Sequence, residues 1–310
     1  MSQSTFIAAW IALFLLLVIC VVFLLLYIRH KHRHLFTRFQ QLKRELDALR
    51  TKQIESLSER VLKLDALREI ESRGLCRAAV PIPPRFTSQF GEDLLIFEFF
   101  KNSPPGFFVE AGAYDGEFAS NTLLLESLGW RGLLVEPHPE MAARCRNVRP
   151  NSIVEEAALG PANASGFVEF TCADAPNGGA ALSFVEVEAS HLDRCAKEEC
   201  RLHKIQVPYR PLDELLDPLT DRVDFLSLDV EGMEMSVLRG FDLERFRPRM
   251  LLLEMQNDNR DRAVSAYLEN AGYRHLAARG CNAFFLASEE IPRFEKIIEH
   301  ALIGFQGGIL

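Results

Sequence analysis

Short, almost uninterrupted apolar segments alternate in the second part of the chain with segments of helical spacing. Two examples are VDFLSLDV at residues 223–230 and MLLLEM at residues 250–255. A strand that is apolar at nearly every position must be covered on both faces, as strands are in a parallel sheet. The alternation therefore predicts an α/β fold, because parallel strands need a crossover, usually a helix, between them.

Candidate elements cover residues 88–310, which we predict to be one domain. The strands are predicted at residues 107–110, 132–136, 152–157, 166–171, 223–229, 250–254 and 283–287. The helices are predicted at residues 92–100, 120–128, 139–146, 212–216, 233–239 and 260–271. The proline-rich segment at residues 80–84 cannot be helical, so we place a linker at residues 74–87 before this domain.

The amino-terminal part has a different character. Residues 6–28 contain no charged side chain, and a helix of this length is ~35 Å long, enough to cross a ~30 Å hydrocarbon core. No Lys or Arg precedes this segment, whereas a cluster of Lys, Arg and His follows it. The positive-inside rule then predicts a retained transmembrane helix in a lipid bilayer, with the amino terminus outside and the later domain in the cytoplasm.

A helical stalk is predicted at residues 35–73. The apolar residues of its first part are spaced alternately by four and three positions: Leu35, Phe39, Leu42, Leu46 and Leu49. The spacing breaks near Lys52 and resumes with Leu57, Val61 and Leu64. This heptad pattern is compatible with a coiled coil that joins two copies of the chain, and equally with a single helix that lies on its own domain.

Charge and cysteine content limit the partners. The net charge of −8 argues against a nucleic-acid partner, because phosphate binding requires a basic surface. The seven cysteines have no regular spacing, which favours reduced thiols over a disulfide framework. The spacing of His191, Cys195, Cys200 and His203 fits no common zinc site, so we predict no bound metal. Either histidine could still reach a ligand site from the preceding glycine-containing segment.

The segment FFVEAGAYDGE at residues 107–117 indicates a ligand pocket. An apolar run ends in Glu110, and Gly112 and Gly116 follow it. A strand that leads through such a turn into a helix forms a nucleotide pocket at the carboxyl edge of an α/β sheet, and glycine lets the backbone approach a ligand closely. The spacing is G-x-x-x-G rather than G-x-G-x-x-G, so the turn that binds a dinucleotide pyrophosphate is absent.

Four predicted strands each end in a carboxylate, and Glu110 is the first of these acids. Glu136 closes the strand after the glycine turn, where an acid can accept hydrogen bonds from ribose hydroxyls. Asp229 and Glu231 follow the segment FLSL, and Glu254 ends the segment MLLLE. Each acid alone could be a helix cap or a solvated carboxylate, but the group predicts a site for a cationic ligand that carries a ribose.

Several segments of the chain resemble the FkbM family of S-adenosylmethionine-dependent methyltransferases. They are SQFGED at residues 88–93, FFVEAGAYDGE followed by Ser120-Asn121-Thr122, LLVEPHPE, VPYRPLDELL and FLSLDVEGMEMSVLRG. The last segment is the most specific to the family, and the resemblance runs from about residue 88 to residue 286. It implies a seven-stranded Rossmann-like methyltransferase domain whose seventh strand is antiparallel, with S-adenosylmethionine as the methyl donor and typically a hydroxyl oxygen as the acceptor.

The resemblance also implies six cofactor-binding residues, which are Glu110, Gly112, Gly116, Glu136, Glu156 and Ala157. The first three would line the methionine part of the cofactor, Glu136 would bind the ribose, and the last two would lie near the adenine. This chain has Glu110 where Asp is frequent in the family, which preserves the charge but extends its reach.

Asp229 and Glu231 match the family's most characteristic acids and would lie near the methyl donor and the acceptor. An alcohol acceptor must lose its proton, so we predict that Asp229 positions the reactants and that Glu231 is a candidate base. The predicted function is a membrane-anchored O-methyltransferase that acts on a hydroxyl-bearing small molecule, glycan or lipid. The alternative is a non-catalytic membrane adaptor that retains the methyltransferase fold.

Overall fold

The computed structural model describes residues 38, 43–44, 55–77, 82–176, 181–186, 189–255 and 259–301. The chain divides into two compact units, Met1–Leu62 and Lys63–Leu310. In the first unit the described residues are helical, and they are residues 38, 43, 44 and 55–62. The second unit begins with helical residues 63–73 and continues as an α/β domain that contains the predicted site residues.

Two predictions concern the amino-terminal part. Among the described residues, no helix combines the length and the apolar character needed to cross a bilayer. This finding contradicts the predicted single-pass membrane localisation, and the predicted span at residues 6–28 lies outside the described residues. The described part of the stalk is helical, and Leu57, Val61 and Leu64 are exposed on it. Dimerisation through the stalk stays a prediction.

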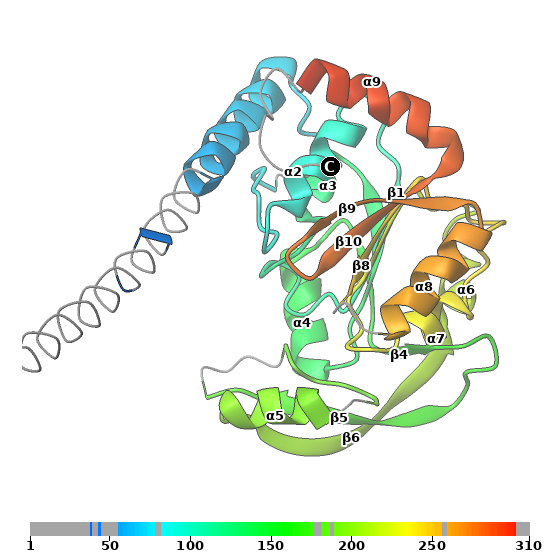
Figure 1. Ribbon diagram of the computed structural model, residues 1–310. Helices are drawn as coiled ribbons and strands as arrows, with labels where there is room; N and C mark the ends of the chain where they lie inside the picture. Colours follow the sequence, from blue (N-terminus) through cyan, green and yellow to red (C-terminus); the bar gives the residue numbers. More distant parts are fainter. Residues whose placement is uncertain are drawn as a thin grey trace, which may run out of the picture. The chain divides into compact units, whose positions relative to one another are not determined.

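A central sheet of seven strands lies in the described part of the domain, in the spatial order β3-β2-β1-β7-β8-β10-β9 (Figure 1). The strands are β1 (Phe107–Ala111), β2 (Arg131–Val135), β3 (Ile153–Glu155), β7 (Phe225–Leu228), β8 (Met250–Glu254), β9 (Tyr273–Arg279) and β10 (Asn282–Ala287). Neighbours from β3 to β8 pair in parallel, whereas β10 is antiparallel to both β8 and β9. The predicted mostly parallel sheet with an antiparallel last strand is therefore confirmed.

Helices cover both faces of this sheet. In Figure 1, α2 (Glu92–Phe100), α3 (Leu123–Ser127) and α4 (Pro139–Val148) lie on one side of it, and α6 (Leu212–Leu216), α7 (Glu234–Leu238) and α8 (Asn259–Asn270) lie on the other. The 3₁₀ helix η1 (Ser288–Glu290) leads into α9 (Ile291–Ala301), which packs against α2. This double cover is why β1 and β7 are buried at every position.

The apolar strand residues form the core of the domain. Leu226, Leu251 and Phe285 are fully buried in one cluster with residues of α6, α7 and α8. Burial of one such side chain contributes ~1.5–3 kcal/mol relative to its exposure. The core therefore fixes the positions of the strands, and with them the points at which the loops leave their carboxyl ends.

A second sheet of three strands lies beside the central one in the described residues. Its order is β4 (Ala158–Gly160), β6 (Arg201–Pro211) and β5 (Phe167–Asp174). The helix α5 (Ala189–Lys197) lies between β5 and β6 in the chain, and the three are grouped at one end of the domain (Figure 1). We refer to residues 167–211 as the insertion.

The two sheets correct one assignment of the sequence analysis. The strand predicted at residues 166–171 lies in the insertion as part of β5, not in the central sheet. Its place in the central sheet is taken by β9, which was not predicted. The sequence YRHLAAR of β9 lacks the continuous apolar pattern because β9 is an edge strand of the sheet and much of it is exposed.

Candidate active site

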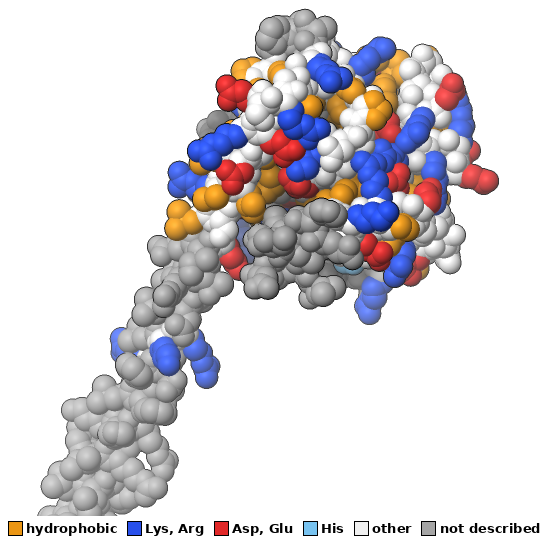
Figure 2. Space-filling model, turned by 90° about the horizontal axis from the view of Figure 1, so that it is seen from above, with side chains coloured by type: hydrophobic (Ala, Val, Ile, Leu, Met, Phe, Trp, Pro, Cys, Tyr) orange, Lys and Arg blue, Asp and Glu red, His pale blue; other side chains and the backbone are white. Residues whose placement is uncertain are grey.

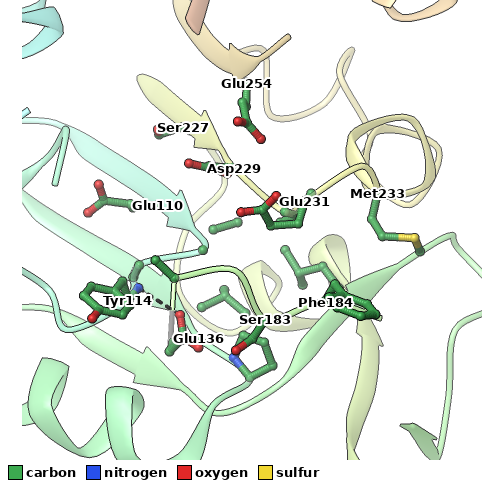
Figure 3. Close-up of a pocket in the computed structure, with 18 of the residues that line it drawn as sticks. Glu110, Tyr114, Glu136, Ser183, Phe184, Ser227, Asp229, Glu231, Met233 and Glu254 are labelled. Atoms are coloured by element: carbon green, nitrogen blue, oxygen red, sulfur yellow. Dashed lines mark hydrogen bonds between the residues drawn. The ribbon is translucent and has the colours of Figure 1, made fainter. Parts of the chain in front are cut away.

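The carboxyl ends of β1, β2, β7 and β8 border a cavity of about 350 Å³. The strand register aligns the last residues of β1, β2 and β7, so the residues that follow them reach the same edge of the sheet. These residues are Gly112, Glu136 and Asp229, and all three line the cavity. Figure 3 shows the cavity with carboxylates on several of its sides.

Gly112 is required by a close approach between two backbones. Its φ is +79°, in the region that favours glycine, and a Cβ atom there would lie 1.8 Å from the backbone oxygen of Asp229. The Gly112 N–H donates to the Val135 carbonyl at 3.0 Å. The absence of a side chain at Gly112 therefore lets this turn pass between the backbones at the ends of β2 and β7. Gly112 also lines the cavity.

Glu110 lies at the cavity, but its carboxylate is occupied by the following loop. The Ser120 hydroxyl, the Asn121 N–H and the Thr122 hydroxyl donate to it at 2.9, 2.7 and 2.6 Å. Its side chain is buried, and Figure 3 shows it directed away from the other acids. Glu110 therefore holds the loop that forms one wall of the cavity.

Arg149 completes this arrangement from the end of α4. Its side chain is fully buried, and its Nε donates to Glu126 at 2.6 Å while its Nη1 lies 3.4 Å from Glu110. It also donates to the Thr122 hydroxyl at 2.8 Å and to the Gly116 carbonyl at 3.1 Å. These two buried carboxylates therefore have a cationic partner within the protein itself. Nothing in the sequence pattern marked Arg149.

Gly116 serves packing rather than the cavity. Its φ is +81°, and a Cβ atom would meet Arg149, Val148 and Cys145 at 3.0 to 3.2 Å. Unlike Gly112, it does not line the cavity. The second glycine of the turn therefore lets the loop lie against α4.

Glu136 stands at the end of β2, on the other side of the cavity from Asp229 (Figure 3). Its two oxygens accept hydrogen bonds from the Tyr114 N–H and the His138 N–H, both at 2.8 Å. Burial raises the pKa of this carboxyl to about 7, although both hydrogen bonds favour the charged form. Since Glu136 has no cationic partner among the residues that the structure describes, it is suited to accept further hydrogen bonds from a ligand.

The two residues predicted to lie near an adenine differ in position. Ala157 is buried and lines the cavity. Glu156 points away from the cavity: its side chain is exposed and lies 3.4 Å from that of Arg146 on the surface. Only Ala157 is therefore placed to contact a ligand in the cavity.

Asp229, Glu231 and Glu254 form an acidic cluster at the ends of β7 and β8. One carboxylate oxygen from each lies within 4.8 Å of the others, and Figure 3 shows the three side chains converging on one space. The register that pairs Leu228 with Leu253 brings Asp229 and Glu254 together. This spacing could accommodate a divalent cation, or one face of an organic cation.

The cluster is short of positive charge. Arg194 is the one Lys or Arg side chain among the described residues that line the cavity, and it pairs at 3.7 Å with Glu198. Desolvation, followed by repulsion from the other acids, raises the pKa of Glu254 to about 7 and raises that of Asp229 well above its ordinary value. Asp229 is nevertheless exposed to the open cavity, so a ligand can reach it.

The turn after β7 presents Glu231 to the cavity. Glu231 has a φ of +51°, which is unusual for a residue with a side chain, and Gly232 follows with a φ of +95°. Glu234, the first residue of α7, accepts hydrogen bonds from the Gly232 and Val230 N–H groups and so holds this turn. No side chain caps α7, so the capping role considered for Asp229 or Glu231 is not seen among the described residues.

His191 contacts Glu231 from the insertion. Its Nδ1 lies 3.2 Å from Oε2 of Glu231, and its Nε2 lies 2.9 Å from the Leu182 carbonyl. The bond to Glu231 is the largest cause that raises the pKa of His191. The sequence analysis noted only that this histidine could reach the site, and no motif distinguished it.

The four zinc candidates of the sequence do not form one site. His203 pairs with Asp174 at 3.1 Å, and His191 pairs with Glu231. Cys195 is buried against Leu182 and Phe184. Among the described residues, the acidic cluster is the single group of three such side chains with the spacing of a metal site.

The insertion supplies another wall of the cavity. Ser183, Phe184 and Arg194 line it, and Phe184 packs edge-on against His191 with 5.2 Å between ring centroids. These residues were not predicted, because they come from a segment whose position depends on tertiary structure alone.

Structural comparison matches the chain to solved structures from several organisms. A protein from Corynebacterium glutamicum has a TM-score of 0.36 at 10% identity, over 74% of this chain and 90% of that one. The precorrin-6y C5,15-methyltransferase of Geobacter metallireducens GS-15 has a TM-score of 0.33 at 16% identity, over 69% and 93%. A putative RNA methyltransferase from Pyrococcus horikoshii has a TM-score of 0.33 at 11% identity, over 71% and 96%. These similarities are distant and identify no residue's role.

No curated protein matches the chain. Residues 110–275, however, match the methyltransferase FkbM domain. The matched region begins at Glu110 and includes the acidic cluster, His191 and Glu136. On this match, which covers more than half of the sequence, the chain belongs to the FkbM methyltransferase family.

Proposed function

We propose that this protein transfers a methyl group from S-adenosylmethionine to a hydroxyl oxygen. Its family supports S-adenosylmethionine-dependent methylation. The observation that carries the proposal is the acidic cluster, three carboxylates at one sheet edge that face an open cavity with little compensating charge. A cationic ligand would stabilise the ionised form of these acids, and the cluster would stabilise that ligand.

The cavity residues suit S-adenosylmethionine in two further respects. Glu136 is a buried carboxylate at the end of β2 and would accept hydrogen bonds from the ribose hydroxyls. Asp229 and Glu254 would face the charged sulfur. When bound, the cofactor supplies a methyl group whose bonding electron pair stays on sulfur as the methyl leaves.

The protein's residues would supply positioning and proton transfer. Asp229 lies between the turn of Gly112 and Glu254, where it would hold the reactants in line. Glu231 would accept the hydroxyl proton as the new oxygen–carbon bond forms. The insertion, with Phe184 at the cavity, would exclude water and contact the acceptor.

Calorimetric titration of the full-length chain with S-adenosylhomocysteine tests the first part of the proposal. We expect saturable binding of one ligand per chain, and binding at least tenfold weaker for Glu136→Gln. Glu156→Gln is a matched control because Glu156 points away from the cavity. An absence of binding to the wild-type chain would contradict the proposal and favour a non-catalytic role.

The acceptor class needs a second experiment. The protein would be incubated with S-adenosylmethionine labelled on its methyl group and with fractionated cell extracts. We expect a labelled product that survives alkaline hydrolysis, because a methyl ether is stable to base. Release of labelled methanol under the same treatment would indicate a methyl ester and contradict transfer to a hydroxyl.

A further inference from the structure

The contacts of His191 determine where its protons lie. The Leu182 carbonyl can only accept a hydrogen bond, so Nε2 of His191, at 2.9 Å, carries a proton. Nδ1 lies 3.2 Å from Oε2 of Glu231, within ion-pair distance, so a second proton on the ring makes His191 the cationic partner of this carboxylate. The imidazolium and the carboxylate together have no net charge.

The surroundings reinforce this pair. His191 and Glu231 are 8% and 11% exposed, and Oε2 of Glu231 is buried with no hydrogen-bond partner among the described residues. Arg194 on the same helix is the other charged group that bears on His191, and it opposes a positive charge there. Glu231 is thus the stabilising partner for a charged His191.

We propose that His191 neutralises Glu231 and thereby divides the acidic cluster into two functional parts. The His191–Glu231 pair has no net charge and remains available to the proton of the methyl acceptor. The Asp229–Glu254 pair has no such partner among the described residues and carries the negative charge that faces the sulfonium. His191 is then a positioning residue that acts through Glu231. This inference rests on the proposed function, because it assigns roles within the same site.

The electrostatic role can be separated from a structural one with two ligands. S-adenosylmethionine and S-adenosylhomocysteine differ by a methyl group and a positive charge, so the ratio of their affinities reports the charge of the site. A loss of packing weakens both ligands and leaves this ratio largely unchanged. The measurement needs no knowledge of the methyl acceptor.

The variants are His191→Gln, Glu231→Gln and Asp229→Asn in the full-length chain, titrated with both ligands at pH 8. His191→Gln leaves Glu231 without its partner, so the preference for S-adenosylmethionine should rise on the order of fivefold, which corresponds to ~1 kcal/mol. Glu231→Gln removes a charge that was already balanced, so the ratio should stay within about twofold of wild type. Asp229→Asn should lower the ratio on the order of fivefold.

His203→Gln is the matched control, because His203 also pairs with a carboxylate, Asp174 at 3.1 Å, and does not line the cavity. It should leave the ratio unchanged. The inference is overturned if Glu231→Gln lowers the ratio as much as Asp229→Asn does, or if His191→Gln leaves it unchanged. If His191→Gln fails to fold, the comparison of Glu231→Gln with Asp229→Asn still decides. Failure of the wild-type chain to bind either ligand would instead overturn the proposed function.

Discussion

Two groups of carboxylates, one around Arg149 and one at the ends of β7 and β8, differ in what balances their charge. Glu110 and Glu126 share the buried guanidinium of Arg149, at 3.4 and 2.6 Å. Asp229 and Glu254 have no Lys or Arg partner among the described residues. The first group ties a loop to α4 and contains its own cation. The second has a cation beside it only when a ligand supplies one.

The rest of the surface makes the contrast clearer. On the face shown in Figure 2, Lys and Arg side chains are mixed with Asp and Glu side chains. Charges of one sign gather instead inside the cavity, where desolvation raises the pKa of both Glu136 and Glu254 to about 7. Desolvated acids that lie close together destabilise the folded protein, and such groups are typical of ligand sites.

The largest effect is expected from breaking the balanced group. Arg149→Met would leave Glu110 and Glu126 buried without a cation and should destabilise the fold by about 3–5 kcal/mol. Urea denaturation measures this change. Arg144→Met is the control, because Arg144 pairs with Glu140 on the surface and its loss should cost less than ~1 kcal/mol. Equal effects of the two substitutions on the free energy of unfolding would mean that the buried Arg149 contributes no more to stability than a surface ion pair.

Asp229→Ala, unlike Arg149→Met, should lower activity and not stability. We expect methyl transfer to fall on the order of a hundredfold or more, while the free energy of unfolding stays unchanged or rises, because an unbalanced charge is removed. Transfer of labelled methyl groups and urea denaturation would be measured on the same preparation. Wild-type turnover by this variant would refute its assignment to the site.

A smaller effect is expected from pH on the ligand-free protein. The folded-state pKa values of Glu136 and Glu254, about 7, exceed the ordinary value of 4.5. The folded state therefore binds more protons than the unfolded state between these values, and stability should fall as pH rises from about 4.5 to above 7. We expect a loss on the order of 1–3 kcal/mol between pH 5.5 and pH 8 in urea denaturation.

The combined substitutions Asp229→Asn and Glu254→Gln should reduce that pH dependence. Glu156→Gln is the control, since Glu156 is on the surface and points away from the cavity. If all variants keep the wild-type slope, the acidic cluster does not carry the unbalanced charge.

The sequence predicted the parts of this contrast that depend on strands. Continuous apolar segments that end in acids located Glu136, Asp229 and Glu254, because parallel strands bring their carboxyl ends to one edge. The insertion was poorly predicted, since β6, with the sequence RLHKIQVPYRP, is largely exposed and has no continuous apolar pattern. Strand β9 was missed for the same reason.

The balance of charge could not be predicted from the sequence. Arg149 is far from Glu110 in the sequence, and His191 reaches Glu231 only because α5 lies against the turn after β7. The two glycines of the first turn looked equivalent in the sequence, yet Gly112 faces the cavity and Gly116 faces α4. Such differences arise from tertiary contacts, which local patterns do not encode.

Proton release on ligand binding tests the central claim most directly. Calorimetric titrations at pH 7 in buffers of different ionisation enthalpy give the number of protons exchanged. If unbalanced acids face the sulfonium, S-adenosylmethionine should release protons on binding, because its charge lowers the pKa of Glu254 and Asp229, whereas neutral S-adenosylhomocysteine should release fewer. Equal proton exchange for the two ligands would contradict the account.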